Sequence, residues 1–420
     1  MSTKNVSTLF QNEVKRIAKE LKIEPWMVTK VQFFKHAESM TEWSLRQLGG
    51  FATAMASHFD SGEDLSQATG ANLVKAFKNK IIKKQATDDY LTQEFLAVFK
   101  EKFDPKQLKL HAPVKVNNKK AKKERAIVAH ISDTHFGANI KSSEMGNVNA
   151  FNWTVASRRM ALFAKQVVEY KEHHRDQTKL IIAINGDIIA GVIHDQEWFS
   201  DLLTTQFTGA LSILSQFITY CASHFQEVEV YCSPGNHGRA MHKMSKQRAM
   251  THKWDSYETM LFMALKEVIF ARHSHIKVEV PKTPYIILDV LGHKGFMTHG
   301  DTVINVGNPG KNINTSSLNT QINTLNASSL SKEKFEFIMC GHCHVSNMQI
   351  TDNGAVMLTN GTLSGADPYC QGLGIFGNQP SQTIFEVTKE HAVGDTRMIK
   401  LVGADKDSSL DKIIQTPELE

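Results

Sequence analysis

Residues 126–137 read AIVAHISDTHFG, so an apolar run is followed at once by a polar cluster that contains Asp133 and His135. Short apolar runs that are rich in β-branched residues and bounded by turn residues are typical of buried strands. The same arrangement recurs along the chain. The other runs, each with the sequence that follows it, are 180–184 with NGD, 228–231 with PGNHG, 296–298 with HGD, and 335–340 with GHCH. The pattern predicts a sheet whose strands end in polar clusters.

Helical spacing appears between the first two runs, where Met160, Phe163, Val167 and Tyr170 form one apolar stripe. This gives a β-α-β pattern. Four further short strands are expected without long helices between them, at 276–280, 285–289, 355–358 and 383–387, which favours added antiparallel pairing. We therefore expect a layered α/β fold, with the sheets of a β-sandwich in the middle and helices on the outside.

The composition excludes several classes of protein. The chain has 420 residues, of which 41% are hydrophobic and 22% charged, which is unlike a disordered or fibrous protein. No run of about 18 uncharged apolar residues occurs, so we expect neither a membrane span nor a secretory leader. The chain has only five cysteines, which is few for its length and an odd number, so we do not expect a disulfide framework. We expect a protein of the cytoplasm.

The hydrophobic pattern and the residue composition divide the chain into four parts. Residues 1–114 show mostly helical patterns, and residues 115–125, KVNNKKAKKER, form a lysine-rich linker. The layered α/β domain should span 126–403, with a polar C-terminal tail at 404–420. Inside the α/β domain, residues 305–331 are rich in Asn, Ser and Thr and are expected to form a long mobile insertion.

Positive charge is concentrated at the front of the chain. Residues 1–125 hold 23 Lys and Arg against 14 Asp and Glu, whereas the remainder holds 25 against 29. Together with Lys30 and Lys35 near a predicted second helix, this favours a helix-turn-helix-like module that contacts nucleic acid. A basic adaptor or an oligomerisation unit explains the same charge equally well, because no recognition helix is evident.

The polar clusters hold residues suited to binding metal ions. Side chains that leave the carboxyl ends of neighbouring strands in an open α/β sheet converge on one crevice. Carboxylates, an amide oxygen and imidazoles together suit Mn²⁺, Fe or Zn²⁺, with Mn²⁺ preferred here. Seven candidates are too many for one ion and fit a pair of divalent ions about 3.5–4 Å apart. They are Asp133, His135, Asp187, Asn236, His299, His342 and His344.

The blocks D-x-H, G-D, G-N-H, H and G-H-x-H, in this order, resemble those of the calcineurin-like metallophosphoesterase superfamily. The resemblance covers residues 126–387, and the wording ISDTHFG is similar to the branch that contains the DNA double-strand-break-repair exonucleases. It implies that Asp133, His135 and His344 hold one metal ion, that Asn236, His299 and His342 hold the other, and that Asp187 bridges them. It also implies a metal-bridging hydroxide as the nucleophile and His237 as the general acid.

Two positions depart from the pattern of the superfamily. Many members carry an acidic residue directly after G-N-H, where this chain has Gly238, and its phosphoprotein phosphatases carry an aspartate where this chain has Ala190. Arg239 is a candidate for binding a substrate phosphate, although a solvated loop arginine is an equal alternative. His194, in a predicted loop seven residues after Asp187, is a second candidate for binding substrate. The alternative is that it is an ordinary polar residue with no role in the site.

The sequence leads to the hypothesis of a dinuclear metal-dependent phosphodiesterase that acts as a DNA nuclease. The alternatives are a phosphatase or nucleotide phosphodiesterase for small molecules or phosphoproteins, and, in another class, a non-catalytic nucleic-acid-binding protein. DNA is the expected partner and a membrane is not. A homodimer and an ATPase partner remain open.

Overall fold

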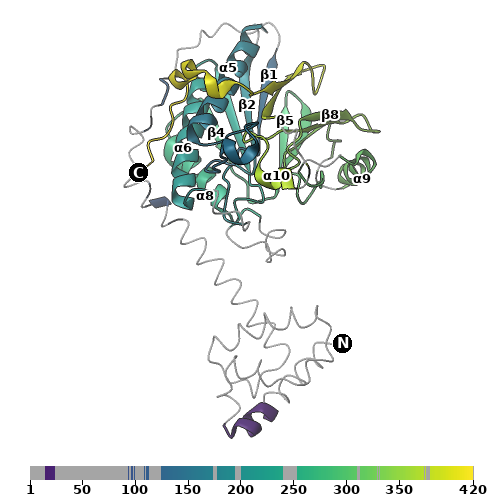
Figure 1. Ribbon diagram of the computed structural model, residues 1–420. Helices are drawn as coiled ribbons and strands as arrows, with labels where there is room; N and C mark the ends of the chain where they lie inside the picture. Colours follow the sequence, from purple (N-terminus) through teal and green to yellow (C-terminus); the bar gives the residue numbers. More distant parts are fainter. Residues whose placement is uncertain are drawn as a thin grey trace. The chain divides into compact units, whose positions relative to one another are not determined.

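The computed structural model separates into two compact units, Met1–Phe95 and Leu96–Glu420. The described residues are 15–23, 93, 96–97, 99, 108, 110–112, 124–173, 177–193, 200–239, 253–309, 313–328, 330, 332–372, 374 and 379–419. Figure 1 shows the two units, whose relative position is not defined. The second unit carries the strands and helices that the following paragraphs describe.

The first sheet has six strands in the order β11-β10-β1-β2-β3-β4. Strands β1 to β4 run parallel to one another, β10 is antiparallel to β1, and β11 is antiparallel to β10. The predicted β-α-β unit is confirmed, since α5 connects β1 to β2. The bounds are β1 Arg125–Ile131, β2 Gln177–Asn185, β3 Glu227–Ser233, β4 Ile276–Glu279, β10 Ser381–Thr388, β11 Thr396–Lys400 and α5 Trp153–His173.

The second sheet has five strands in the order β5-β6-β7-β9-β8. Strand β7 pairs in parallel with both β6 and β9, and antiparallel strands close the two edges. The bounds are β5 Tyr285–Val290, β6 His293–Thr298, β7 Phe337–Cys340, β8 Asn347–Ile350 and β9 Val356–Thr359. Both sheets are therefore mixed, as the alternation of long helices and direct strand connections suggested.

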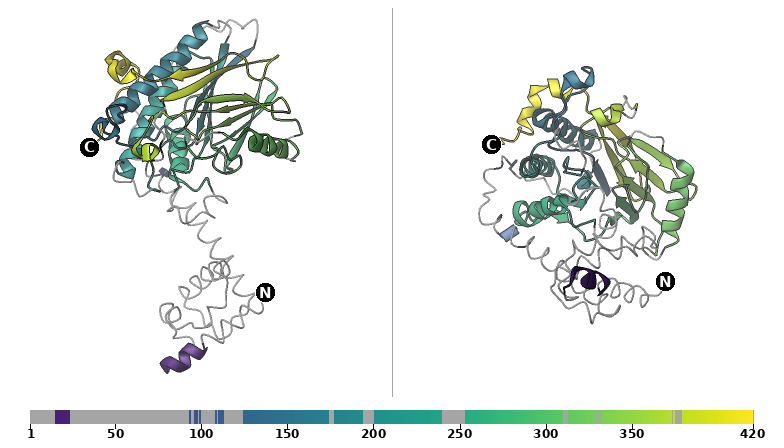
Figure 2. Two further views of the ribbon diagram at one scale, coloured as in Figure 1. Left: turned by 45° about the vertical axis from the view of Figure 1, so that its right-hand side comes forward. Right: turned by 60° about the horizontal axis from the view of Figure 1, so that its bottom comes forward.

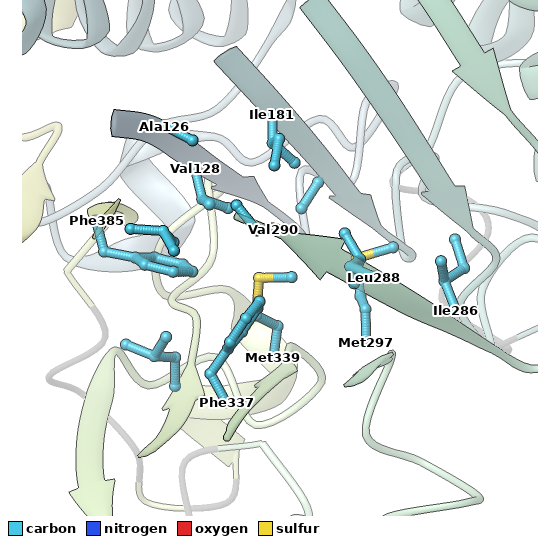
Figure 3. Packing of buried hydrophobic residues seen from close by; sticks show 13 residues of the cluster. Ala126, Val128, Ile181, Ile286, Leu288, Val290, Met297, Phe337, Met339 and Phe385 are labelled. Carbon is cyan, nitrogen blue, oxygen red and sulfur yellow. The ribbon is translucent and has the colours of Figure 1, made fainter. Parts of the chain in front are cut away.

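The two sheets pack face to face over one buried apolar layer. Alternate residues of a strand point to one face, so Val128 of β1, Phe385 of β10 and Phe337 of β7 meet in the same layer (Figure 3). The rings of Phe337 and Phe385 lie 5.8 Å apart, edge to face. This layer fixes the two sheets relative to each other, and with them the loops at their strand ends.

Helices cover the outer faces of both sheets (Figure 2). On the first sheet lie α5 and α6, Leu203–Ala222, whose Phe163 and Phe217 rings stack at 5.8 Å. On the second sheet lies α9, Thr315–Asn326, which buries Leu318, Ile322 and Leu325 against Phe296. The segment 305–331 is therefore not the expected mobile insertion where it is described. Its apolar residues repeat at helical spacing, but they are few among the many Asn, Ser and Thr residues, which favoured the prediction of a mobile insertion.

The C-terminal segment packs against α5 instead of forming a polar tail. It contains two 3-10 helices, Ala404–Lys406 and Ser408–Lys412, and it buries Leu410 and Ile414. Arg158 of α5 donates two hydrogen bonds, 2.8 and 2.9 Å long, to the carboxylate of Asp411. Few apolar residues, separated by charged ones, were enough to anchor this segment.

Within the first unit, residues 15–21 form a helical segment in which Ile17 and Ala18 are buried. The expected second helix, near Lys30 and Lys35, and most of the lysine-rich linker lie outside the described residues. Among the described residues, no helix is long and apolar enough to cross a membrane.

Candidate metal centre

Five loops meet at the strand ends and carry all seven predicted ligands. Backbone hydrogen bonds tie the first two loops together, because the amides of Asp133 and His135 donate to the carbonyls of Gly186 and Asp187 at 3.0 and 3.1 Å. The His342 amide donates to both Asp133 carboxylate oxygens at 3.0 and 3.1 Å. The convergence predicted from the ends of the strands is thus present.

The first cluster consists of Asp133, His135 and His344, whose ligand atoms lie within 4.8 Å of one another. His344 Nε2 is 3.4 Å from Asp133 Oδ1 and 3.1 Å from His135 Nε2. All three side chains are almost completely buried. The second carboxylate oxygen of Asp133 accepts a 2.5 Å hydrogen bond from Ser132 Oγ, which fixes the orientation of the carboxylate.

The second cluster consists of Asp187, His299 and His342, again with ligand atoms within 4.8 Å of one another. His299 Nε2 lies 3.0 Å from Asp187 Oδ2. The Nδ1–H of His299 donates to the carbonyl of Asn185 at 2.8 Å, so Nε2 is the nitrogen directed at the cluster. A ring nitrogen fixed in this way by a backbone carbonyl is the usual arrangement for a metal-binding histidine.

Asn236 stands between Gly235 and His237, whose backbones approach Asp187, and its Oδ1 is buried with no hydrogen-bond partner among the described residues. An amide oxygen buried without a partner costs stability unless something else binds it. The donor set of carboxylates, imidazoles and one amide oxygen suits divalent ions such as Mn²⁺, Fe²⁺ or Zn²⁺. The residues present therefore fit two divalent ions, one at each cluster.

Five of the candidate ligands have left-handed backbone conformations, which non-glycine residues rarely adopt. They are Asp133, His135, Asp187, His342 and His344, with φ between 46 and 66°. Each such residue costs about 1–3 kcal/mol and persists only where its surroundings hold it. Strain concentrated on these residues marks the loops as a functional site.

Glycines leave the space that the ligand loops need. A Cβ on Gly235 would collide with the Asp187 carboxylate, and one on Gly186 would lie 2.8 Å from His299 Nδ1. Gly186 also has φ +77°. A side chain at either position would displace a candidate ligand.

The charge states of the clusters follow from burial and from their neighbours. Burial alone would raise the pKa of Asp187 and of Asp133, but nearby histidines, His299 and His344 respectively, bring each pKa below its ordinary value. Burial alone would lower the pKa of His299, yet Asp187 raises it to about 9. Burial lowers the pKa of His342 to about 4. The carboxylates are thus ionised at neutral pH, and His342 is neutral.

His237 lies beside both clusters without belonging to either. Its ring packs on that of His135 at 4.6 Å, and its Nε2 lies 4.0 Å from Asp187 Oδ2. The Nδ1–H donates to the Ala190 carbonyl at 2.8 Å, and the side chain is 20% exposed. Solvent therefore reaches the His237 side chain, as it must reach a residue that faces a substrate.

The two predicted substrate-binding residues differ in outcome. Arg239 is half-buried next to the loops, and burial lowers the pKa of its guanidinium, while Asp301 and Asp187 raise it. Its Nε is buried with no hydrogen-bond partner within the part of the chain that the structure describes. His194 lies outside the described residues, so its predicted role stays a prediction.

Three further residues support the site and were not singled out from the sequence. Glu258 accepts hydrogen bonds from two ligand loops, and the buried Lys253 pairs with Asp301. The Asn185 side chain donates to the carbonyls of Thr298 and Met339 at 3.0 and 3.2 Å. No local motif marks Lys253 or Glu258, whereas Asn185 stands within the NGD block.

The family profile described as calcineurin-like phosphoesterase matches residues 127–346, more than half of the chain. This chain belongs to the calcineurin-like phosphoesterase family. Members of this family typically use two divalent metals, and the two clusters provide two candidate sites. This calcineurin-like domain is therefore a metal-dependent phosphoesterase.

Comparison with solved structures adds similar but distant proteins. A 5'-nucleotidase from Candida albicans is 12% identical, with 73% of this chain and 59% of that chain covered and a TM-score of 0.29. A dimetal phosphatase from Danio rerio is 10% identical, with 66% and 98% covered and a TM-score of 0.30. A hypothetical protein from Thermus thermophilus is 10% identical, with 66% and 98% covered and a TM-score of 0.29. A comparison with curated proteins found no match.

Proposed function

We propose that this calcineurin-like domain is a phosphodiesterase that cleaves DNA with the help of two divalent ions, and that these ions are Mn²⁺. The observation that carries the phosphodiesterase part is the placement of His237, which packs on His135 of the first cluster and lies 4.0 Å from Asp187 of the second. A phosphate held between the clusters would have this imidazole at its leaving oxygen.

The residues divide the work of the reaction. Bound divalent ions supply Lewis acidity and activate the attacking water. Asp133, His135 and His344 would hold one ion, Asn236, His299 and His342 would hold the other, and Asp187 would be the ligand shared by both. With its Nδ1–H engaged by Ala190, His237 offers Nε2 for donating a proton to the leaving oxygen.

The preference for DNA is supported by charge. Residues 1–125 carry nine more basic than acidic residues, and such an excess attracts a polyanion before it reaches the active site. Arg239, half-buried beside the ligand loops, presents a planar guanidinium that matches a backbone phosphate. Neither feature is needed for a small phosphomonoester.

The test is a Mn²⁺-dependent cleavage assay with end-labelled single- and double-stranded DNA, run beside a mononucleotide and a phosphomonoester. The His237→Ala variant serves as the blank. Cleavage of DNA by the wild type and its loss in the variant would support the nuclease. Turnover of the small esters alone would replace it with a phosphatase or nucleotide phosphodiesterase, and DNA binding without turnover of any ester would replace it with a non-catalytic binding protein.

A further inference from the structure

Glu258 connects two loops of the metal centre through a single buried carboxylate. It lies in the first turn of α8, Tyr257–Ala264, and its side chain is 0% exposed. Its Oε1 accepts a 2.6 Å hydrogen bond from the amide of Ile188, and its Oε2 accepts one of 2.7 Å from Gly235. These amides stand directly after Asp187 and directly before Asn236. The carboxylate therefore fixes the backbone beside two candidate ligands.

The start of α8 is bonded to the G-N-H loop in a second way. The amide of Tyr257 donates to the carbonyl of Gly238 at 2.7 Å, and Arg239 forms an isolated antiparallel bridge with Ser256. Ser256 in turn caps the helix by accepting from the amide of Thr259 at 3.1 Å. Glu258 is thus presented to the two loops from a helix end whose own position is fixed.

Gly238 leaves the space that the Glu258 side chain occupies. A Cβ at Gly238 would lie 2.7 Å from Glu258 Cδ and 2.9 Å from its Cβ, so no larger residue fits beside Glu258 without displacing it. In one glutamate side chain, Cβ and Cδ are about 2.5 Å apart. A glutamate at 238 would therefore bring its carboxyl group to the space that Glu258 now fills. Gly238 does not have a left-handed φ, so its backbone accepts an L-residue.

We propose that Glu258 is a positioning residue of the metal centre, which holds the Asp187 and Asn236 loops in register from α8 and takes the place of an acidic side chain at position 238. This explains the departure from the superfamily pattern at Gly238, since the acid is present but comes from twenty residues further along the chain. The inference rests on the metal centre of the proposed function and not on DNA as the substrate.

The experiment compares four full-length proteins with the wild type. Glu258→Gln keeps the shape but faces one backbone N–H with an NH₂ group, and Glu258→Ala removes both acceptors. Gly238→Glu combined with Glu258→Ala moves the carboxyl group to the other position. Glu279→Gln, on the exposed face of β4, is the control for a change of charge. Mn²⁺ affinity is measured by calorimetry, and amide hydrogen exchange is followed without added metal in peptides covering 186–190 and 234–239.

We expect Glu258→Gln and Glu258→Ala to bind Mn²⁺ about 10- to 100-fold more weakly, as for other residues that orient metal ligands. Exchange in both peptides should be faster, and the combined variant should recover both readouts. Wild-type affinity and exchange in Glu258→Gln would overturn the positioning role, as would a lower melting temperature with unchanged Mn²⁺ affinity. A combined variant as impaired as Glu258→Ala would overturn the shared position. A wild type that binds Mn²⁺ but leaves DNA intact would contradict the nuclease alone.

Discussion

Replacement of His237 by alanine tests whether this side chain is the acid of the reaction. General acid catalysis by a positioned side chain contributes about 10²- to 10⁴-fold, which corresponds to about 2.7–5.4 kcal/mol of transition-state stabilisation. We expect turnover of a DNA phosphodiester to fall by this factor. The ring packs on that of His135 and its Nε2 is 4.0 Å from the Asp187 carboxylate, so it contacts the metal centre without being one of its candidate ligands.

Metal binding should survive the same substitution. The close contact of residue 237 with Asp187 is made by its backbone amide, which donates to Oδ1 at 2.8 Å and remains in alanine. Mn²⁺ titration by calorimetry should therefore give nearly the wild-type affinity and stoichiometry. His173→Ala, at the exposed end of α5, is a matched control and should change neither turnover nor binding.

The leaving group separates proton donation from simple charge stabilisation. Single-turnover rates should be measured with DNA, whose leaving alkoxide needs a proton, and with bis-p-nitrophenyl phosphate, whose aryloxide leaves readily without one. The loss in His237→Ala should be much larger for DNA. Equal losses on the two substrates would refute the assignment of His237 as the acid, and wild-type turnover on both would remove it from the mechanism.

Three further predictions concern the metal centre and the two segments that the sequence misjudged. Mn²⁺ at about 100 times its dissociation constant should stabilise the wild type by about 2.7 kcal/mol, and a thermal shift of similar size in Asp187→Asn would contradict the shared-ligand role. Ile322→Ala, in the buried face of α9, should lower the unfolding free energy by about 2–5 kcal/mol in chemical denaturation, whereas the exposed Asn323→Ala should change it little. The Arg158 hydrogen bond lowers the pKa of Asp411, so its stabilisation is present above the ordinary aspartate pKa and is lost as the pH falls through the lowered value. Asp411→Asn should therefore be less stable than wild type at pH 7 and match it at low pH, and an equal difference at both pH values would contradict the ion pair.

The sequence predicted the strands and the convergence of ligands because both depend on local signals. The run at 126–131 and the stripe from Met160 to Tyr170 have the periodicities of a buried strand and a helix, and the structure places β1 and α5 there. Polar residues at the ends of parallel strands must lie at one edge of the sheet. This rule alone predicts that Asp133 and Asp187 lie close together.

Other features could not be predicted because they arise from contacts between distant segments. The helix α9 is stabilised by Phe296 and other residues of the second sheet, and its own composition is largely polar. The C-terminal segment depends on Asp411 meeting Arg158, 253 residues apart. Glu258 has no neighbour in sequence that marks it, and its role follows from the fold alone.

The left-handed ligands and the residues that support them belong to one physical arrangement. A backbone held at φ 53° at Asp187 relaxes unless other groups oppose it. Three sets of hydrogen bonds oppose this relaxation. The Glu258 carboxylate accepts from the amide of Ile188, which follows Asp187, and the His237 amide donates to the Asp187 carboxylate. The Asn185 side chain joins β2 to the second sheet. The three sets join Asp187 or a residue within two positions of it to α8, to the G-N-H loop and to the second sheet, so this loop cannot move without breaking hydrogen bonds to another element. The packing of the two sheets over one core therefore stabilises the loops that carry both candidate metal-binding clusters.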